Sequence, residues 1–384
     1  MLKKIKILNV IKTLNLGGAE VNLLNLTRAM NHDCFDIHVA YSFGGELESK
    51  FKEVGVTLFK YADKDFKVKS LETFRIIYRL AKYIHVHKIQ VVQTHNFGAH
   101  IWASIAAKLT GCKIVEHVHD FRYFEPQDFI RRRGLNKQYK YVHKFRNISD
   151  CVVVLTKQNK EFLVKEKIYP LERIREYQNG IDLKNDMNQN DRTRVVTEFK
   201  VRSDALIILT PVRIAPEKNI DLILRIAPKV IQKIPNAVFL IAGNGPLYEE
   251  VTQKIRELGL EDHIKMIGYC PDIQGLLKST DIFLLPSFLE LHSIAILEAM
   301  CHSVPMIISQ DVGCNSEFII NWRNGVLLDP FKDEGWSEAI IKLSENKELR
   351  HQIGSHGYET CMKNFNIKDV VRKFEGLYVD LLTI

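Results

Sequence analysis

Short apolar runs alternate along the chain with longer stretches in which apolar residues recur at helical spacing. The apolar runs of the first half are 5–10, 35–41, 91–94, 113–118 and 151–155. Their lengths are those of buried strands, whereas the stretches between them, such as 20–30, 71–87 and 99–109, are long enough for helices. Alternation of strands and helices predicts a parallel sheet with helices on both faces.

The pattern is interrupted at 179–191, a polar segment rich in Asn and Asp that we interpret as a linker. It then restarts, with apolar runs at 205–210, 237–242, 264–267, 282–285 and 306–308 and helical stretches at 221–234, 247–258, 295–301 and 368–382. A chain of 384 residues exceeds one ordinary core. We therefore expect two Rossmann-like, doubly wound α/β domains, 1–185 and 200–365, that face a cleft.

The composition is that of a globular protein, with 46% hydrophobic and 26% charged residues. No apolar stretch approaches the ~20 residues of a membrane span, and the start of the chain does not look like a signal peptide. The seven cysteines are scattered without a CxxC pair, which argues against disulfides and zinc. We expect a cytoplasmic protein.

The net charge of +8 favours anionic partners, and part of it is concentrated in one segment. Residues 131–146 contain seven Lys or Arg and no acid, with aromatic residues between them. Such a segment is typical of binding to an anionic membrane surface, and a solvated helix face is the alternative. Since no nucleic-acid recognition motif accompanies the charge, we expect no nucleic-acid partner.

Candidate chemistry follows the strands, because ligands of open α/β sheets bind at the carboxyl ends of the strands. Gly17 and Gly18 come after the first strand and open a helix, so the backbone there can approach a ligand; a plain turn is the alternative. The dinucleotide fingerprint G-x-G-x-x-G is absent, which disfavours a nicotinamide dehydrogenase. Arg213 and Lys218 follow the strand at 205–210 and are a pair suited to a diphosphate.

Two carboxylates lie eight residues apart after the strand at 282–285. Pro286 and Ser287 predict a strand-to-helix turn, with the helix beginning close to Glu290. Its free N–H groups would form an anion site, and Glu298 would lie on nearly the same face, about 12 Å along the axis. The alternative is a buried α/β element that carries two surface glutamates.

Together these motifs resemble the retaining glycosyltransferases of the GT-B fold, in the family 4 group that uses nucleotide-activated sugars. The matching positions span nearly the whole chain and are Gly17-Gly18-Ala19-Glu20, Thr94-His95, His119-Asp120, Asn179-Gly180-Ile181-Asp182, Arg213 with Glu217-Lys218, Gly243-x-Gly245-Pro246, Glu290 with Glu298, and Gly313 with Glu317.

The resemblance implies a role for each position. Arg213 and Lys218 would grip the donor diphosphate, Glu290 would bind the hydroxyls of the donor sugar, and Glu298 would accept the ribose hydroxyls. Backbone N–H groups of the helix opening would hold sugar and phosphate, and His119 would lie near the transferred sugar. The last helix would cross back onto the first domain. The remaining implied donor-side positions are Gly17, Gly18, Gly243, Leu291, His292, Ser293 and Glu317, and His95 is implied on the acceptor side.

The chain departs from the family pattern at two positions. Leu291 stands where a glycine usually follows the first Glu, and Ser303 stands at the small, glycine-rich step after the helix. Asp63 and Asp65 formally match the metal-binding D-x-D pattern of other glycosyltransferases, but they lie in a polar loop among lysines. We expect no metal and no cofactor besides the nucleotide-sugar co-substrate.

The resulting hypothesis is transfer of a hexose-type sugar from a UDP- or GDP-sugar to an acceptor hydroxyl, with retention of configuration. By analogy the acceptor would be a lipid-linked or growing glycan of envelope polysaccharide, handled at the inner membrane face. A nucleotide-sugar epimerase of the same fold and a non-catalytic homologue that binds nucleotide sugars are the alternatives.

Overall fold

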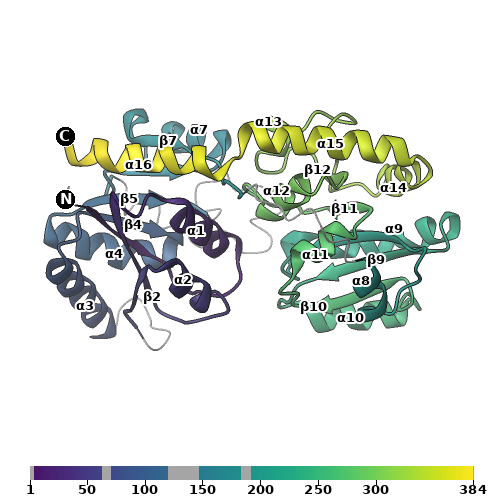
Figure 1. The fold of residues 1–384 in the computed structure, drawn as a ribbon, viewed down its shortest axis with the longest axis horizontal. Helices are drawn as coiled ribbons and strands as arrows, with labels where there is room; N and C mark the ends of the chain where they lie inside the picture. The colour runs from purple at the N-terminus through teal and green to yellow at the C-terminus, as the bar shows by residue number, and fades with distance from the viewer. Residues whose placement is uncertain (1–3, 63–70, 120–146, 183–191, 384) are drawn as a thin grey trace. The chain divides into compact units, whose positions relative to one another are not determined.

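The computed structural model describes residues 4–62, 71–119, 147–182 and 192–383. The chain divides into two compact units, an N-terminal unit of residues 1–180 with 367–384, and a C-terminal unit of residues 181–366 (Figure 1). Each unit is built on one parallel sheet. This confirms the predicted fold class of two doubly wound α/β domains.

The N-terminal unit contains a seven-stranded sheet of order β3-β2-β1-β4-β5-β6-β7. Its strands are β1 (Ile5–Val10), β2 (Phe35–Tyr41), β3 (Thr57–Lys60), β4 (Val91–His95), β5 (Lys113–His117), β6 (Cys151–Val154) and β7 (Ile174–Glu176). Neighbouring side chains of a strand point to opposite faces. Accordingly Ile7 belongs to the core on one face of the sheet and Leu8 to the core on the other.

Helices cover both faces of this sheet. They are α1 (Gly18–Ala29), α2 (Glu48–Val54), α3 (Leu71–His87), α4 (Asn96–Thr110), α7 (Lys157–Lys165), the 3-10 turn η2 (Leu171–Arg173) and α16 (Ile367–Thr383). The core on one face receives side chains from α1, α2 and α16, whereas the core on the other receives them from α3 and α4.

The C-terminal unit contains a six-stranded sheet of order β10-β9-β8-β11-β12-β13. Its strands are β8 (Leu206–Pro211), β9 (Ala237–Ala242), β10 (Ile264–Gly268), β11 (Ile282–Leu285), β12 (Met306–Ser309) and β13 (Val326–Leu328). Its helices are α8 (Arg192–Glu198), η3 (Pro216–Lys218), α9 (Ile220–Lys233), α10 (Tyr248–Glu257), α11 (Ile273–Lys278), α12 (Ile294–Cys301), α13 (Asn315–Phe318), α14 (Trp336–Glu345) and α15 (Lys347–Asn364).

The last helix, α16, returns to the N-terminal unit, as predicted (Figure 1). Its apolar positions Val371, Phe374 and Tyr378 are buried in the core beside α1. The chain passes from one unit to the other at 180–181 and returns at 366–367. These two connections lie side by side, since the backbone N–H of Ile181 donates to the carbonyl of Phe365 at 2.9 Å. Within the described residues, no helix combines the length and the apolar character that crossing a membrane requires.

Candidate functional site

Two turns meet at the carboxyl ends of the strands in the C-terminal unit. The first follows β8 and contains η3, and the second follows β11. The backbone N–H of Phe288 donates to the carbonyl of Glu217 at 2.8 Å, and the Asn219 side-chain amide donates to the carbonyl of Pro286 at 3.1 Å. Since Asn219 has a positive φ of 54° and is buried, this amide contact holds a tightly bent backbone.

An ion pair completes the junction between the two turns. Lys218 Nζ lies 2.6 Å from Glu290 Oε1, and the Ser287 hydroxyl donates to the same oxygen at 2.9 Å. Ser287 and Glu290 are buried. The carboxylate is therefore fixed in position by charge-assisted contacts before any ligand arrives.

Arg213 lies in the first turn with an exposed side chain. Behind it the glycine loop after β9 packs closely against the backbone, because the Ile214 N–H donates to the carbonyl of Asn244 at 3.0 Å. Gly243 has φ +140°, and a Cβ at this position would lie 2.0 Å from the carbonyl oxygen of Val212. The glycine is therefore needed for the approach of two protein segments to each other.

The predicted start of the helix after β11 is wrong. Helix α12 begins at Ile294 with Ser293 as its N-cap, so Glu290 lies in the preceding turn and not on the same helical face as Glu298. The contacts to Glu217 and Lys218 hold the turn in a non-helical path. Glu298 itself lies in α12, half-buried, and accepts a hydrogen bond at Oε1 from the Gln274 amide at 3.2 Å.

Leu291, at the position where the family has glycine, is buried in the protein interior. Its carbonyl accepts a hydrogen bond from the backbone N–H of Cys314 at 3.1 Å. Gly313 has φ +58°, and a Cβ there would lie 2.1 Å from the same carbonyl oxygen. Close approach in this region thus depends on Gly313, while the Leu291 side chain contributes to the core.

His292 is buried between aromatic rings, with centroids 5.6 Å from Phe318 and 4.9 Å from Phe365. Burial lowers its pKa to about 3, so the ring is neutral at pH 7. Its side chain packs in the core. Ser293 is the N-cap of α12, so the free backbone N–H groups of the helix opening begin at this residue. Glu317 is exposed in the short helix α13.

In the N-terminal unit, Gly17 is the N-cap of α1 and Gly18 is its first residue. A Cβ on Gly17 would lie 2.4 Å from Glu20 Oε2, whereas a Cβ on Gly18 would meet nothing within 4 Å. Glu20 accepts a hydrogen bond from the Thr13 hydroxyl at 3.0 Å, and burial raises the pKa of its carboxyl group. Gly18 is therefore the position where the backbone is open to a ligand.

The carboxyl ends of β4 and β5 bring together three histidines, His95, His117 and His119, which we call the histidine cluster. His95 and His117 are opposite each other in the strand register and are buried. His95 Nδ1 lies 3.1 Å from His119 Nε2, and His95 Nε2 lies 3.1 Å from Asn9 Oδ1. The structure thus joins the two predicted histidines, His95 and His119, directly.

These contacts determine the tautomers of the pair. His95 Nε2 has two neighbours, the acceptor Asn9 Oδ1 at 3.1 Å and the amide Gln93 Nε2 at 3.4 Å. The closer contact favours the tautomer in which His95 Nε2 carries the hydrogen and His95 Nδ1 accepts. His119 must then donate through Nε2, which leaves Nδ1 as the acceptor atom of its ring. Burial, and next the charge of a protonated His119, lower the pKa of His95 far below its usual value, so His95 stays neutral.

Four residues of this region were not predicted from the sequence: Asn9, Gln93, His117 and Tyr378. The Tyr378 hydroxyl on α16 donates to Gln93 Oε1 at 2.7 Å, and Gln93 Nε2 lies 3.5 Å from His117 Nδ1. Asn9 and Gln93 are opposite each other in the register of β1 and β4. A polar residue inside an apolar buried strand was the available signal for Asn9 and Gln93.

Among the described residues, the histidine cluster is the group that could hold a metal ion, with ring nitrogens within 4.8 Å of one another. Both nitrogens of His95 have protein partners without a metal. The expectation that no metal is needed stays a prediction. The basic segment 131–146, Asp120 and the D-x-D at Asp63 and Asp65 lie outside the described residues.

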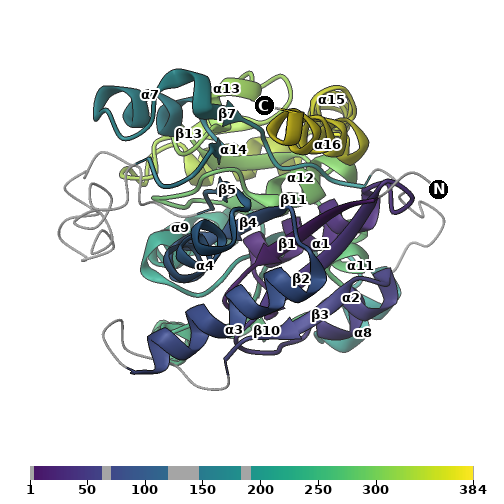
Figure 2. The same ribbon diagram turned by 90° about the vertical axis from the view of Figure 1, so that its left-hand side faces the viewer.

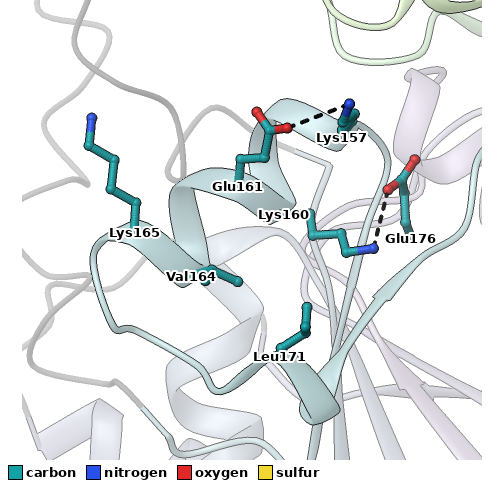
Figure 3. Close-up of a pocket in the computed structure, with 7 residues that line it drawn as sticks. All are labelled: Lys157, Lys160, Glu161, Val164, Lys165, Leu171 and Glu176. Carbon is teal, nitrogen blue, oxygen red and sulfur yellow. Dashed lines mark ion pairs between the residues drawn. The ribbon is translucent and has the colours of Figure 1, made fainter.

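A surface pocket of about 410 Å³ lies elsewhere, between α7, η2 and β7 (Figure 3). Four of its five charged side chains form ion pairs with one another, Lys157 with Glu161 at 3.7 Å and Lys160 with Glu176 at 3.8 Å. None of the predicted site residues lines it. The pocket therefore adds nothing to the candidate site.

Comparisons with known proteins agree with this architecture. A family model described as "Glycosyltransferase Family 4" matches residues 16–185, and one described as "Glycosyl transferases group 1" matches residues 191–360. The chain is 26% identical to "UDP-Gal:alpha-D-GlcNAc-diphosphoundecaprenol alpha-1,3-galactosyltransferase" of Escherichia coli over 99% of this chain and 98% of that protein. It is 23% identical to "Capsular polysaccharide biosynthesis glycosyltransferase CapH" of Staphylococcus aureus, over 95% and 98% of the two chains.

Solved structures show the same fold. Anabaena Alr3699/HepE in complex with UDP and glucose superposes with a TM-score of 0.82 at 17% identity, over 97% of this chain and 99% of that one. The likeness extends over both units. The resemblance predicted from the sequence is confirmed: the chain belongs to the family 4 glycosyltransferases of the GT-B fold, which are nucleotide-sugar-dependent enzymes.

Proposed function

We propose that this protein transfers a hexose-type sugar from a UDP-sugar to a hydroxyl of a lipid-linked or growing glycan, with retention of configuration. The arrangement of Lys218, Glu290 and Ser287 carries the proposal, because it places a fixed carboxylate beside a cation at the carboxyl ends of the strands. A carboxylate accepts hydrogen bonds from sugar hydroxyls, and an ammonium group attracts a diphosphate.

In this proposal Arg213 and Lys218 bind the donor diphosphate and Glu290 binds the donor sugar. Glu298 accepts the ribose hydroxyls, and the α12 opening at Leu291, His292 and Ser293 offers backbone N–H groups. The turn held by Gly243, and Glu317 on α13, support the same donor side. In the N-terminal unit, Gly17 and Gly18 open α1 and contribute to the donor side, His119 lies at a strand end near the transferred sugar, and His95 lies on the acceptor side.

The proposed reaction needs no covalent enzyme intermediate. The bond between the anomeric carbon and the diphosphate oxygen breaks, and the acceptor oxygen bonds to that carbon on the same face. The acceptor proton passes to the departing phosphate oxygen. Arg213, Lys218 and the N–H groups of α12 stabilise the developing negative charge, which is where preorganised cations lower the barrier most.

The choice of UDP over GDP rests on similarity. The Escherichia coli galactosyltransferase that matches 99% of this chain uses UDP-Gal and a diphosphoundecaprenol-linked acceptor. The superposed Anabaena structure contains UDP and glucose. A lipid-linked acceptor would lie at an anionic membrane face, and the net charge of +8 would favour binding of the protein there.

The test is thermal stabilisation by UDP, GDP, ADP and their sugars, with and without EDTA, followed by turnover with a lipid-linked acceptor. Selective stabilisation by UDP ligands, unchanged by EDTA, is expected. Stabilisation by GDP ligands alone would contradict the donor assignment. Conversion of the donor sugar without an acceptor would point to an epimerase, and binding without any turnover to a non-catalytic homologue.

A further inference from the structure

Helix α3 carries two aromatic side chains on its outer face. Phe74 and Tyr78 are four residues apart, so they are neighbours on the helix surface, and they are 73% and 67% exposed. Val86, further along the same helix, is 61% exposed. Large exposed apolar side chains grouped on one helix indicate an interaction surface.

The opposite face of α3 fixes this orientation. Ile76, Leu80 and Ile84 are buried in the core that α3 shares with α4, and Trp102 of α4 belongs to the same core. The aromatic pair therefore faces outward because the helix is anchored on its other side. Figure 2 shows α3 running along the outer side of the N-terminal unit.

Basic residues flank the aromatic pair. Arg75, Arg79 and Lys82 are exposed on the same side of the helix, and Glu72 is the single acidic residue of α3. The ion pair of Glu72 with Arg75, at 3.3 Å, is itself exposed and contributes little. The outer face is thus both aromatic and cationic, which complements a surface that is anionic and has an apolar interior.

The position of α3 brings this face near the candidate acceptor side. The Arg79 guanidinium donates to the carbonyl of Lys60, the last residue of β3, at 2.9 Å. The half of α3 that precedes Arg79 therefore lies at the carboxyl-end edge of the parallel sheet. His95 and His117 end β4 and β5 at this same edge.

We propose that the outer face of α3, formed by Phe74, Arg75, Tyr78, Arg79 and Lys82, docks on an anionic lipid bilayer. The aromatic rings enter the headgroup region, Arg75 and Lys82 contact lipid phosphates, and Arg79, which donates to Lys60, adds to the positive charge of the face. A second copy of the chain is a poorer occupant, because two such faces would oppose like charges. The inference goes beyond the proposed reaction and does not depend on it.

The first experiment is cosedimentation of the full chain with vesicles of phosphatidylcholine, alone or mixed with phosphatidylglycerol. Binding is expected only to the mixed vesicles, and to weaken as salt is added. The Arg75→Gln and Lys82→Gln variants are each expected to bind about fivefold more weakly, since each basic residue near such a surface contributes a factor of this size. The double variant Phe74→Ser/Tyr78→Ser is also expected to weaken binding.

Matched controls use the C-terminal unit. Leu258, 56% exposed after α10, is replaced by Ser, and the exposed Lys347 by Gln. Both are expected to bind like the parent chain. Equal binding by the α3 variants and the parent chain would overturn the proposal. So would equal binding of the parent chain to neutral and to anionic vesicles, or α3 variants that change the oligomeric state without changing vesicle binding.

A second measurement detects contact with lipid directly, so unfolding of a variant cannot account for a positive result. In the Phe74→Trp variant the new indole is expected to be quenched by brominated lipid in anionic vesicles. The parent chain provides the background from its own three tryptophans. Quenching no greater than in the parent chain would contradict insertion of this face.

Discussion

Lys218 and Glu290 are 72 residues apart in the chain, and their side chains meet at 2.6 Å. The pair links the turn after β8 to the turn after β11 within one unit. Because Ser287 donates to the same carboxylate oxygen, Glu290 keeps its position by two contacts from different segments. The contact that places the carboxylate thus also places the cation.

The first prediction concerns the two cations of this site. Lys218→Ala and Arg213→Ala are each expected to lower turnover by about 10²-fold or more, since each removes one preorganised charge. The two variants should differ in stability. Lys218→Ala leaves a buried carboxylate without its cation and is expected to cost about 1–3 kcal/mol, whereas Arg213 is exposed.

Steady-state kinetics and urea unfolding of both variants check this. Glu290→Gln keeps the shape of the side chain while removing its charge, so it measures what the charge of Glu290 contributes to turnover and to stability. Near-normal turnover in both Ala variants would contradict the proposed donor site. Equal stability of the two would contradict the structural role of the Lys218 contact.

The second prediction concerns Asn9, which acts on His119 through His95. Asn9→Leu removes the acceptor of His95 Nε2 and is expected to lower kcat about ten- to a hundredfold by misplacing His119. The KM for the donor should change little, because the charged groups proposed to bind the donor, Arg213, Lys218, Glu290 and Glu298, lie in the C-terminal unit. Asn9→Asp keeps an acceptor at this position but adds a negative charge, which raises the pKa of His95. As the pH is lowered, the kcat of this variant should therefore begin to fall at a higher pH than that of the parent chain.

Tyr378→Phe is the matched structural control. It removes a buried hydroxyl that donates to Gln93, whose amide nitrogen lies 3.4 Å from His95 Nε2, but it leaves the closer contact of Asn9 with His95 in place. It is expected to lower stability without moving the pH dependence of kcat. If Asn9→Asp and Tyr378→Phe share the pH profile of the parent chain, Asn9 has a purely structural role.

The sequence pattern predicted the central strands of both sheets because these strands are buried on both faces and therefore read as apolar runs. The missed strands β3, β7 and β13 all lie at sheet edges. β3 begins and ends with an exposed residue, Thr57 and Lys60, and β7 is only three residues long. Edge strands pair on one side and need no long apolar run, so periodicity missed the three shorter ones, although it found the five-residue edge strand β10 from the run at 264–267.

The site was predicted less completely than the fold. Strand ends pointed to Arg213 and Lys218, because their position follows from sheet topology alone, whereas His95 was named only through the family resemblance. The helix start near Glu290 was wrong, since tertiary contacts to Glu217 and Lys218 override the local helical pattern. The role of Asn9 depends on strand register, which a single sequence does not provide.

The third prediction concerns Ser303, the second departure from the family pattern. Ser303 has φ +55°, in the left-handed region that costs a residue with a side chain about 1 kcal/mol or more. Ser303→Gly is expected to stabilise the protein by about 0.5–1 kcal/mol and to leave turnover unchanged. Ser303→Ala keeps the Cβ and should give no such gain, and urea unfolding of both variants measures the difference.

The fourth prediction is an acid-dependent loss of stability that originates at His292. Because burial lowers its folded-state pKa to about 3, the unfolded chain binds this proton near the usual pKa of about 6.5 while the folded chain does not. Above pH 6.5 the ring is neutral in both the folded and the unfolded state, so it contributes no pH dependence to the free energy of unfolding. As the pH falls below this value, proton binding stabilises the unfolded state relative to the folded one, and the free energy of unfolding decreases.

Between pH 7.5 and 5.5 this single group should remove about 1.4 kcal/mol of stability, one pH unit of full linkage. His292→Leu is expected to reduce the pH dependence by that amount, whatever it does to the stability at pH 7.5. Trp322 and Trp336 lie in the same unit as His292, so a Trp102→Phe background lets fluorescence follow the unfolding of this unit. An identical pH dependence with and without His292 would show that its ring is accessible to protons in the folded state.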